Sequence, residues 1–427
     1  MAERSPFPRV FWVANLIEIL ERFSYYGIYF GFGVYMTSLG YSRDQLGVVQ
    51  TIFLLLSYTV PLFSGTFADR YGFKKVFIVS YLAYLPSILL LILTKSFSGI
   101  ALTMLSIGLA AGIFKPLVSA TVRATTDRTN ATLGFGIFYA MVNVGGTIGP
   151  VVAGRLRAIS WNYAFYTAAA AIVVMLFITI FFYKEPPREI EGKTVGQKLR
   201  EIGETLANVK FSLYLLLLGV FFWIPFWAFF NLCALYTDSN LDTARLYEVI
   251  RGVFGTAFAN FLSQEKNGVH HVLGETISTT GYIIMILQVF IARIFEKFRP
   301  IPSFLFGLFM MAIGFVVIGL AHVSAVSLLF VGITFFAIGE MISSPRIQEY
   351  ITWIAPKEKA GLYMGSNFLA VGVGSLSGLI YTPLYGRFSD AGAPEKVWYV
   401  LAGHILVGIV ALLIFQRVAG GFVQQEE

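Results

Sequence analysis

The sequence predicts an all-α polytopic membrane protein with twelve transmembrane helices, and three observations support this fold class. Of its 427 residues, 57% are hydrophobic and 13% are charged, against about 25% charged in an ordinary soluble domain. Apolar runs of spanning length, about 20 residues each, follow one another along the chain. The single cysteine excludes a disulfide scaffold. The composition also excludes an ordinary soluble enzyme and a disordered chain.

The first apolar run carries charged residues in its middle and has no small-residue cleavage site. We therefore expect a retained helix and not a signal peptide. Polar or glycine-containing stretches separate the runs that follow. The twelve predicted spans cover residues 9–38, 46–68, 76–94, 99–121, 132–154, 162–183, 211–237, 276–294, 303–321, 327–350, 362–386 and 397–416.

Basic residues predict the orientation of these spans. An even number of spans places both termini on one side, and twenty of the 31 lysines and arginines lie on that side. The opposite side carries nine, and two lie within spans. Because positively charged loops stay in the cytoplasm, we expect cytoplasmic N- and C-termini. The net charge of +7 therefore reflects topology, and we expect no nucleic-acid partner.

Two polar segments set the predicted domain organisation. Residues 184–210 carry two prolines near their start and mixed charges, which suits a cytoplasmic linker with a surface helix between bundles 1–183 and 211–427. Residues 238–275 form a long outer loop with a partly amphipathic stretch. For this stretch we prefer a helix lying on the outer membrane surface, and a functional lid is the alternative.

Enzyme and metal-site motifs are missing from the sequence. It contains no P-loop, GxSxG elbow, HExxH or paired CxxC. Cys233 lies in span seven, where we expect a small core residue. His270 and His271 are adjacent without Cys or carboxylate spacing, which is a poor arrangement for a metal. We therefore expect no enzyme activity, no metal and no cofactor.

The turn between spans two and three carries a motif of glycines and charges. Gly65 should allow close helix approach and Gly72 a tight turn. Asp69, near a helix end, can pair with a base on a neighbouring helix and latch the cytoplasmic side. The cytoplasmic gate motif comprises Gly65, Asp69, Arg70, Gly72, Lys74 and Lys75.

This motif, GxxxD[RK]xGxK[RK], resembles the signature of the major facilitator superfamily. In span five, Gly145, Gly149, Pro150 and Gly154 resemble the GxxxGPxxG packing motif of the same superfamily, which is often noted in antiporters. The resemblance implies the major facilitator fold: two six-helix bundles with a substrate site near the bilayer midplane.

Span one holds the sharper signal. Glu18, Glu21 and Arg22 are spaced so that their side chains stack on one helical face. Ionisable groups inside a bilayer are costly unless they are paired or wetted. One interpretation is a structural ion pair between Glu18 and Arg22. The second carboxylate is surplus to that pair and favours a functional site.

The string that begins at Glu18, ExxERFxYYG, resembles the helix-one signature of the proton-coupled oligopeptide transporter family. Lys115 lies in a KPxxS segment like the one that carries the family's substrate-facing lysine, and Glu340 lies in a GExxxSP segment. At these positions and at the others that the resemblance aligns, we expect the substrate-binding residues Arg22, Tyr25, Tyr26, Tyr29, Tyr58, Lys115, Asn143, Trp227, Asn231, Glu340, Ser344 and Asn367. For proton coupling, we expect Glu18, Glu21, Arg22 and Glu340.

Several positions depart from that family's pattern. Tyr29 stands where members usually carry an arginine, and Asn231 where they carry its glutamate partner. Losing both together leaves no orphan charge, so we expect a neutral Tyr29/Asn231 arrangement at the outer gate. Asn367 replaces a tryptophan, and residues 279–281 lack the Asn-Pro of helix eight. These departures argue against typical peptide specificity.

Charge counting gives an expected mechanism. Three intramembrane acids, Glu18, Glu21 and Glu340, face two bases, Arg22 and Lys115. One carboxyl group lacks a counter-charge if all are ionised, and burial disfavours its charged form. We expect Glu21 or Glu18 to carry the proton while switching its pairing with Arg22. Lys115 and Arg22 would hold a substrate carboxylate, and Glu340 an amino group.

Three functional classes stay open. We prefer a proton-coupled symporter, acting as a monomer in a plasma (bacterial inner) membrane, for small peptides or related zwitterionic or carboxylate metabolites. The alternative is a proton-driven antiporter that exports drugs or metabolites, favoured by the span-five motif and the missing gate pair. A receptor or assembly protein that keeps a transporter fold is the third class.

Overall fold

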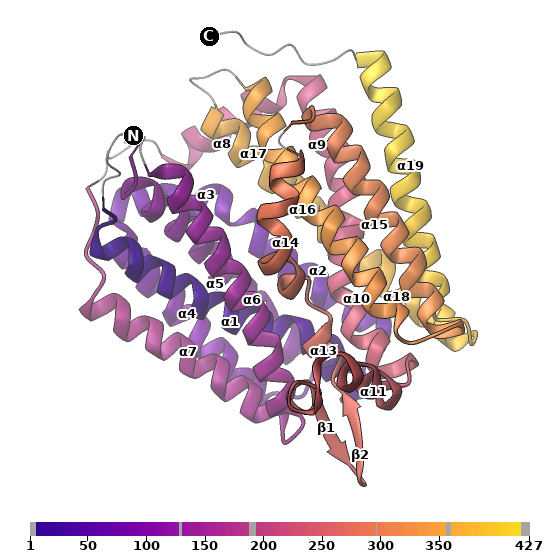
Figure 1. Ribbon diagram of the computed structural model, residues 1–427. Helices are drawn as coiled ribbons and strands as arrows, with labels where there is room; N and C mark the ends of the chain where they lie inside the picture. The colour runs from indigo at the N-terminus through magenta and orange to yellow at the C-terminus, as the bar shows by residue number, and fades with distance from the viewer. Residues whose placement is uncertain (1–5, 128–129, 188–193, 296, 356–359, 420–427) are drawn as a thin grey trace. The chain divides into compact units, whose positions relative to one another are not determined.

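The structure, a computed structural model, describes residues 6–127, 130–187, 194–295, 297–355 and 360–419. Almost all of this chain is helical, with one β-hairpin (Figure 1). The first group of helices is α1 (Arg9–Ser38), α2 (Arg43–Thr59), α3 (Pro61–Tyr71), α4 (Phe73–Leu93), α5 (Phe97–Ala124), α6 (Ala131–Arg157), α7 (Trp161–Phe181) and α8 (Val195–Leu206). The second group is α9 (Val209–Leu218), α10 (Ile224–Asn240), α11 (Thr243–Phe254), α12 (Thr256–Phe261), α13 (Gly274–Ile277), α14 (Gly281–Phe295), α15 (Pro300–Val323), α16 (Leu328–Ile354), α17 (Ala360–Gly374), α18 (Ser377–Asp390) and α19 (Lys396–Ala419).

Helix lengths and composition confirm a polytopic membrane protein. Within the described ranges, ten helical segments are long and apolar enough to cross a membrane, and the bent pair of α2 and α3 makes an eleventh. The remaining predicted span is α1, whose 30 residues are long enough to cross. Its glutamates, arginine and tyrosines make it more polar than the others.

Four predicted spans are interrupted rather than continuous, and one of them, 276–294, breaks at 278–280 between α13 and α14. Pro61 bends the second span by 43° between α2 and α3, because proline has no N–H and clashes with the preceding turn. A π-helical turn, Gly219–Trp223, separates α9 from α10. The predicted span 362–386 is divided at Ser375 and Leu376 into α17 and α18.

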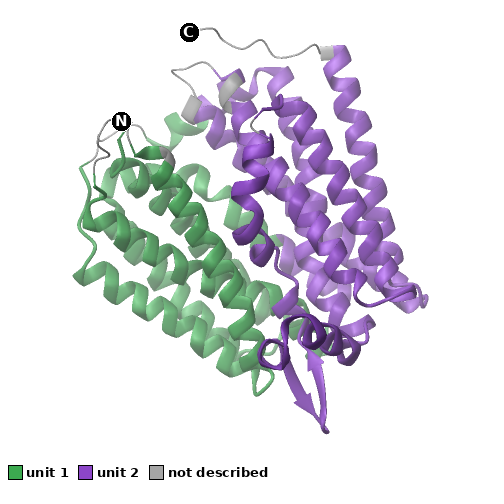
Figure 2. Cartoon of the chain, viewed as in Figure 1, with its two compact units in different colours: residues 1–41, 52–199 green, residues 42–51, 200–427 purple. Residues whose placement is uncertain are grey.

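The chain divides into two compact units (Figure 2). Unit 1 comprises residues 1–41 and 52–199, and unit 2 comprises residues 42–51 and 200–427. The first half of α2 thus belongs to unit 2, which the sequence did not indicate. It is held there by buried side chains: Gln50 Oε1 accepts from Thr382 Oγ1 at 2.7 Å, and Thr51 Oγ1 accepts from the Leu379 N–H at 3.0 Å.

Glycines set the closest helix contacts inside each unit. In unit 1, a Cβ at Gly145 or Gly149 of α6 would collide with the backbone of α1. In unit 2, Gly307 of α15 and Gly339 of α16 are packed against each other in the same way. Small residues let membrane helices approach closely, so the span-five motif fixes α6 against the charged helix α1.

The long loop after α10 contains more structure than a single surface helix. The predicted helix is present as α11 and α12, and the antiparallel hairpin of β1 (Ser263–Lys266) and β2 (Val269–Val272) follows. The adjacent histidines have separate partners: His271 Nδ1 lies 3.0 Å from Thr243 Oγ1, and His270 stacks on Tyr247. Among the described residues, no cluster of His, Cys, Asp or Glu could hold a metal ion.

We expect the segment of this loop that joins α11 to α12 to enter the lipid headgroup region. Val253, Phe254, Phe258 and Phe261 are 70%, 67%, 37% and 51% exposed, and the chain from 252 to 261 carries no charge. Exposed aromatic residues next to spanning helices suit a membrane interface. Phe254→Trp protein in vesicles should therefore lose tryptophan fluorescence when brominated lipids are added. Leu199→Trp, in the linker helix α8, is the matched control for aqueous exposure, and equal quenching of both variants contradicts the assignment.

Candidate functional site

The charged residues of α1 form one buried cluster in unit 1. Glu18, Glu21 and Arg22 are 1%, 0% and 6% exposed. Arg22 Nε lies 2.7 Å from Glu18 Oε1 and 3.1 Å from Glu21 Oε2, so the arginine contacts both carboxylates. Tyr84 Oη of α4 donates to Glu21 Oε1 at 2.7 Å. The interaction is therefore a triad with a tyrosine, and not the simple Glu18–Arg22 pair.

Lys115 lies close to this cluster on α5. Its Nζ is 4.0 Å from the ring centroid of Tyr25 and 4.8 Å from that of Tyr58. The ammonium is buried and has no hydrogen-bond partner within the described part of the chain. Desolvated cation–π contacts contribute about 2 kcal/mol, which does not replace three missing hydrogen bonds. Lys115 is thus a buried cation whose donors are free for an anion.

Aromatic side chains of α1 and α2 surround the two cations. The Arg22 guanidinium lies 5.7 Å from the Tyr25 ring, and Tyr25 and Tyr29 pack on Phe53 at 5.1 and 4.9 Å. The structure therefore brings together Arg22, Tyr25, Tyr29, Tyr58 and Lys115. Phe53, which connects two of these tyrosines, was not among the predicted residues.

Two further predicted residues of unit 1 lie on α1 and α6. The Tyr26 ring contacts the Tyr25 ring edge-on, with centroids 5.0 Å apart, and also packs against Gly146 of α6, where a Cβ would lie 3.1 Å from it. Asn143 Nδ2 donates to the carbonyl of Tyr139 at 2.8 Å, one turn earlier on its own helix. The structure thus records no contact of Asn143 with the charged cluster among the described residues.

Charge balance differs between the units. Glu18 and Glu21 balance Arg22 and Lys115 in unit 1, so the surplus acid of the sequence count is Glu340 in unit 2. Glu340 lies on α16 and accepts a hydrogen bond from Thr280, just before α14. Its Oε2 is buried and has no hydrogen-bond partner within the described chain. Glu340 is therefore a partly satisfied buried carboxyl group.

The other predicted unit 2 residues lie on three helices. Trp227 is 2% exposed on α10, and Ser344 is partly buried on α16, one turn after Glu340. Asn367 is partly buried on α17, and its Oδ1 has no hydrogen-bond partner among the described residues. Asn231 Nδ2 donates to Ser377 Oγ at 3.0 Å.

Asn231 belongs to a polar network that the sequence analysis missed. Its backbone carbonyl accepts from Gln50 Nε2 at 3.2 Å, and Gln50 in turn accepts from Thr382. These three residues and Ser377 are all buried. The sequence shows these polar residues within predicted spans, which could have indicated a network. Their contacts with one another, however, depend on the packing between α2, α10 and α18.

Two local expectations for the gate motif, at Gly72 and Gly65, can be compared with the structure of unit 1. Gly72 has φ +98° between α3 and α4, as the predicted tight turn requires. Within unit 1, Gly65 does not mediate close helix approach, because a Cβ there would meet no described atom of that unit within 4 Å. Arg70 lies over the Tyr71 ring, and Lys74 Nζ donates to the Ile180 carbonyl at 2.8 Å. The latching role of Asp69 stays a prediction, as does the role of Lys75.

A residue outside the motif anchors its second helix. Glu185 accepts from the backbone N–H groups of Phe73 and Lys74 at 2.6 and 3.0 Å. A carboxylate at a helix N-terminus satisfies free donors and complements the helix dipole. Glu185, in the predicted linker, thus fixes α4 at the Gly72 turn, and sequence reasoning missed this contact.

The two motif glycines should respond differently to alanine. Gly72→Ala forces a Cβ into the left-handed region and should destabilise the protein by about 1–3 kcal/mol. Gly65→Ala should be neutral or stabilising by about 0.5–1 kcal/mol, since it replaces glycine in a helix with open space around it. Thermal unfolding of the two purified variants checks this. Equal melting temperatures contradict the assigned roles.

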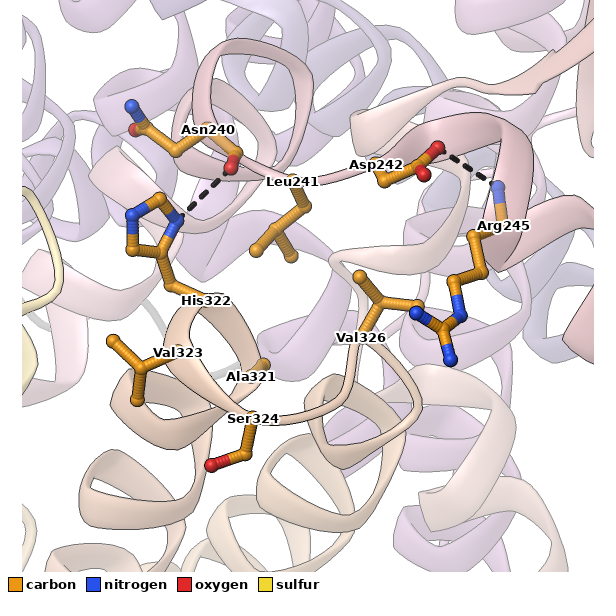
Figure 3. Close-up of a pocket in the computed structure, with 9 residues that line it drawn as sticks. All are labelled: Asn240, Leu241, Asp242, Arg245, Ala321, His322, Val323, Ser324 and Val326. Carbon is orange, nitrogen blue, oxygen red and sulfur yellow. Dashed lines mark hydrogen bonds between the residues drawn. The ribbon is translucent and has the colours of Figure 1, made fainter.

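A cavity of about 270 Å³ lies elsewhere in unit 2, at the ends of α10 and α15 (Figure 3). His322 Nδ1 lies 3.0 Å from the Asn240 carbonyl, and Asp242 caps α11 by accepting from the Arg245 N–H. None of the predicted substrate residues lines it. The polar groups that line this cavity thus form hydrogen bonds within the loops. We therefore do not place the candidate site in this cavity.

Comparison with known sequences agrees with the fold and the motifs. Residues 14–244 match the family model described as Major Facilitator Superfamily. The chain is 26% identical over 230 residues to the quinolone resistance protein NorA of Staphylococcus aureus, covering 53% of this chain and 58% of that protein. The match thus spans less than two thirds of that relative's length. A "Na(+), Li(+), K(+)/H(+) antiporter" of Planococcus maritimus is 23% identical over 396 residues, covering 88% of both chains.

Solved structures show the same fold. A point mutant of the nucleoside transporter NupG aligns with a TM-score of 0.77 and 11% identity, covering 95% of this chain and 99% of that one. A POT family transporter in complex with a thioalcohol-conjugated peptide aligns with a TM-score of 0.74 and 18% identity, covering 97% of both chains. At these identities the likeness establishes the architecture and leaves the substrate open.

Proposed function

The chain belongs to the Major Facilitator Superfamily, and on that premise we propose that it is a proton-coupled secondary transporter. Its substrates are small peptides or related zwitterionic or carboxylate metabolites, carried by alternating access across a plasma membrane. It needs no cofactor, and each monomer contains a complete pathway. The observation that carries the proposal is the buried, unpartnered Lys115 ammonium beside the Glu18–Glu21–Arg22 cluster, within the described part of the chain.

Lys115 supplies the anion site. An ammonium held against two tyrosine rings is already desolvated, so an incoming carboxylate gains a charge-assisted hydrogen bond without first displacing a protein partner. The rings of Tyr25 and Tyr58 give that site an amphipathic wall. This chemistry favours substrates with a carboxylate over neutral solutes.

Charge neutrality couples the proton to the substrate. With both glutamates ionised, the unit 1 cluster is neutral, so a substrate carboxylate alone adds an uncompensated buried negative charge. A proton on one glutamate cancels that charge. Binding of a proton and a carboxylate together is therefore favourable, whereas binding of either one alone is unfavourable. Symport requires this coupling.

Glu21 is the preferred proton carrier. Arg22 keeps its 2.7 Å hydrogen bond to Glu18 when Glu21 is neutralised, so no buried arginine is orphaned. The Glu21–Arg22 contact at 3.1 Å leaves Glu21 Oε2 without a hydrogen bond among the described residues. The Glu21–Arg22 contact is therefore weaker than the Glu18–Arg22 contact. The Tyr84 hydroxyl can donate to Glu21 in either protonation state.

Glu340 supplies the complementary group for an amino-terminal ammonium. It is a buried carboxyl with one free oxygen and no recorded cation among the described residues of unit 2. Glu340 is therefore the group of unit 2 that we propose binds a substrate ammonium.

Peptide binding tests this proposal directly. A ligand at 100 times its Kd stabilises the folded protein by about 2.7 kcal/mol, so Ala-Ala or Ala-Ala-Ala should raise the melting temperature of purified protein. The C-terminally amidated and N-acetylated forms are matched probes, and each should bind more weakly because it lacks one charge. If no di- or tripeptide changes the melting temperature, the peptide assignment is wrong.

Proton-driven export is the second candidate function. The α1–α6 contact through Gly145 and Gly149 is built by a motif often noted in antiporters, and the relatives include NorA and a cation/proton antiporter. The same charge cluster then binds proton and substrate in alternation. The direction of coupled flux distinguishes the two functions.

A further inference from the structure

The π-helical turn in the α9–α10 span follows from one proline. Pro225 has no N–H, so it cannot complete the α-helical ladder, and the Ile224 N–H reaches back five residues to the Gly219 carbonyl. Ile224 is thereby occupied, and the residue five positions after Val220 is Pro225 itself. The Val220 carbonyl is left without a backbone donor from its own helix, which is costly inside a membrane.

His404 of α19 meets that carbonyl. Its imidazole hydrogen-bonds to the Val220 backbone, and its Nδ1 lies 2.5 Å from Tyr381 Oη of α18. A carbonyl can only accept, so the nitrogen facing Val220 carries hydrogen and Nδ1 accepts from Tyr381. The two bonds together select one tautomer, with hydrogen on Nε2.

The turn is wedged by further contacts inside unit 2. His404 packs edge-on against Phe221, with ring centroids 5.4 Å apart. A Cβ at Gly219 would collide with Val373 of α17, and one at Gly408 of α19 would collide with Phe221. The turn therefore contacts both neighbouring helices, and it precedes Trp227 by about one helical turn.

We propose that His404 is a positioning residue: it bonds the carbonyl that Pro225 leaves free and so fixes the π-helical turn that orients Trp223 and Trp227. A π-turn within a helix is often a functional hinge, and an ionisable residue inside a membrane usually has a functional partner. His404 thus sets how easily the α9–α10 span bends. The role is independent of the transported substrate.

Hydrogen–deuterium exchange of the full-length protein tests this role. His404→Phe keeps a ring but removes both hydrogen bonds, and exchange of the amides in 219–224 should rise about fivefold or more. His404→Gln should retain wild-type exchange, because its amide nitrogen can still donate to Val220. Tyr381→Phe should have a smaller effect, since the Val220 bond remains. His322→Gln is the matched control, because His322 also contacts a backbone carbonyl, far along the chain from the turn.

Unchanged exchange at 219–224 in folded His404→Phe protein overturns the proposal. If that variant does not fold, nitrogen NMR of histidine-labelled wild-type protein replaces it, with the His404 signal assigned from its loss in His404→Gln. The expected spectrum has hydrogen on Nε2 and an unprotonated Nδ1 that shifts in Tyr381→Phe. Hydrogen on Nδ1, or no shift in Tyr381→Phe, contradicts the assignment. Both measurements need no substrate, so they are informative even if the proposed transport activity is wrong.

Discussion

Lys115→Met protein is expected to lose substrate transport while its stability stays within about 1 kcal/mol of the wild type, because one of the two glutamates takes up a proton and so restores the neutrality of the unit 1 cluster. The wild-type side chain buries an ammonium without a hydrogen-bond partner among the described residues, and an apolar chain of similar volume removes that desolvation cost. Truncating one partner of a buried charge pair costs about 2–5 kcal/mol. Peptide affinity should therefore fall at least about 30-fold, as measured by thermal shift and by uptake into proteoliposomes.

Lys95→Met is the matched control. Lys95 also lies over a tyrosine ring, 5.3 Å from Tyr35, but its Nζ donates to the Tyr35 hydroxyl at 3.1 Å. This variant should lose a little stability and keep its transport. If Lys115→Met protein transports at the wild-type rate, Lys115 does not form the anion site.

Glu21→Gln protein is expected to exchange substrate across the membrane but not to concentrate it. Glutamine mimics a permanently protonated carboxyl, and Arg22 keeps its bond to Glu18, so the loaded state remains accessible. Accumulation under a proton gradient should fall to the equilibrium level, whereas substrate counterflow should stay within about threefold of the wild type.

Glu18→Gln separates the two carboxylates. Without the 2.7 Å partner, Arg22 has Glu21 as its sole carboxylate among the recorded contacts of the described residues, and Glu21 cannot release that pairing to take a proton. We therefore expect both counterflow and accumulation to fall. Glu21→Gln protein that still concentrates substrate excludes Glu21 as the carrier.

The fold could be predicted from composition and periodicity because each span is a local feature. Runs of apolar residues predicted the number and order of spans, and Gly72 predicted its turn. The breaks were harder. Pro61 and Pro225 are visible in the sequence, but proline is tolerated inside other spans here, such as α5 and α16. A proline leaves one backbone carbonyl of the preceding turn without its N–H donor. Whether the helix then bends or forms a π-helical turn depends on which neighbouring group donates to that carbonyl.

The candidate site was predictable where its residues share one helix. The spacing of Glu18, Glu21 and Arg22 placed them on one face of α1, and the structure groups them so. Contacts between helices were not predictable in the same way. The Tyr84 bond to Glu21 joins residues 63 positions apart, and no periodicity reports it. Gly65 differs, since a motif glycine was assigned a packing role that the described helices of unit 1 do not require.

Proton flux in proteoliposomes tests the central claim most directly. Purified protein is reconstituted with a trapped pH indicator, and a dipeptide is added outside without any imposed gradient. If proton and peptide enter together, the lumen acidifies as the peptide enters, and this acidification is absent in Glu21→Gln protein. Lumenal alkalinisation on peptide entry indicates antiport, and peptide entry without any pH change contradicts proton coupling altogether.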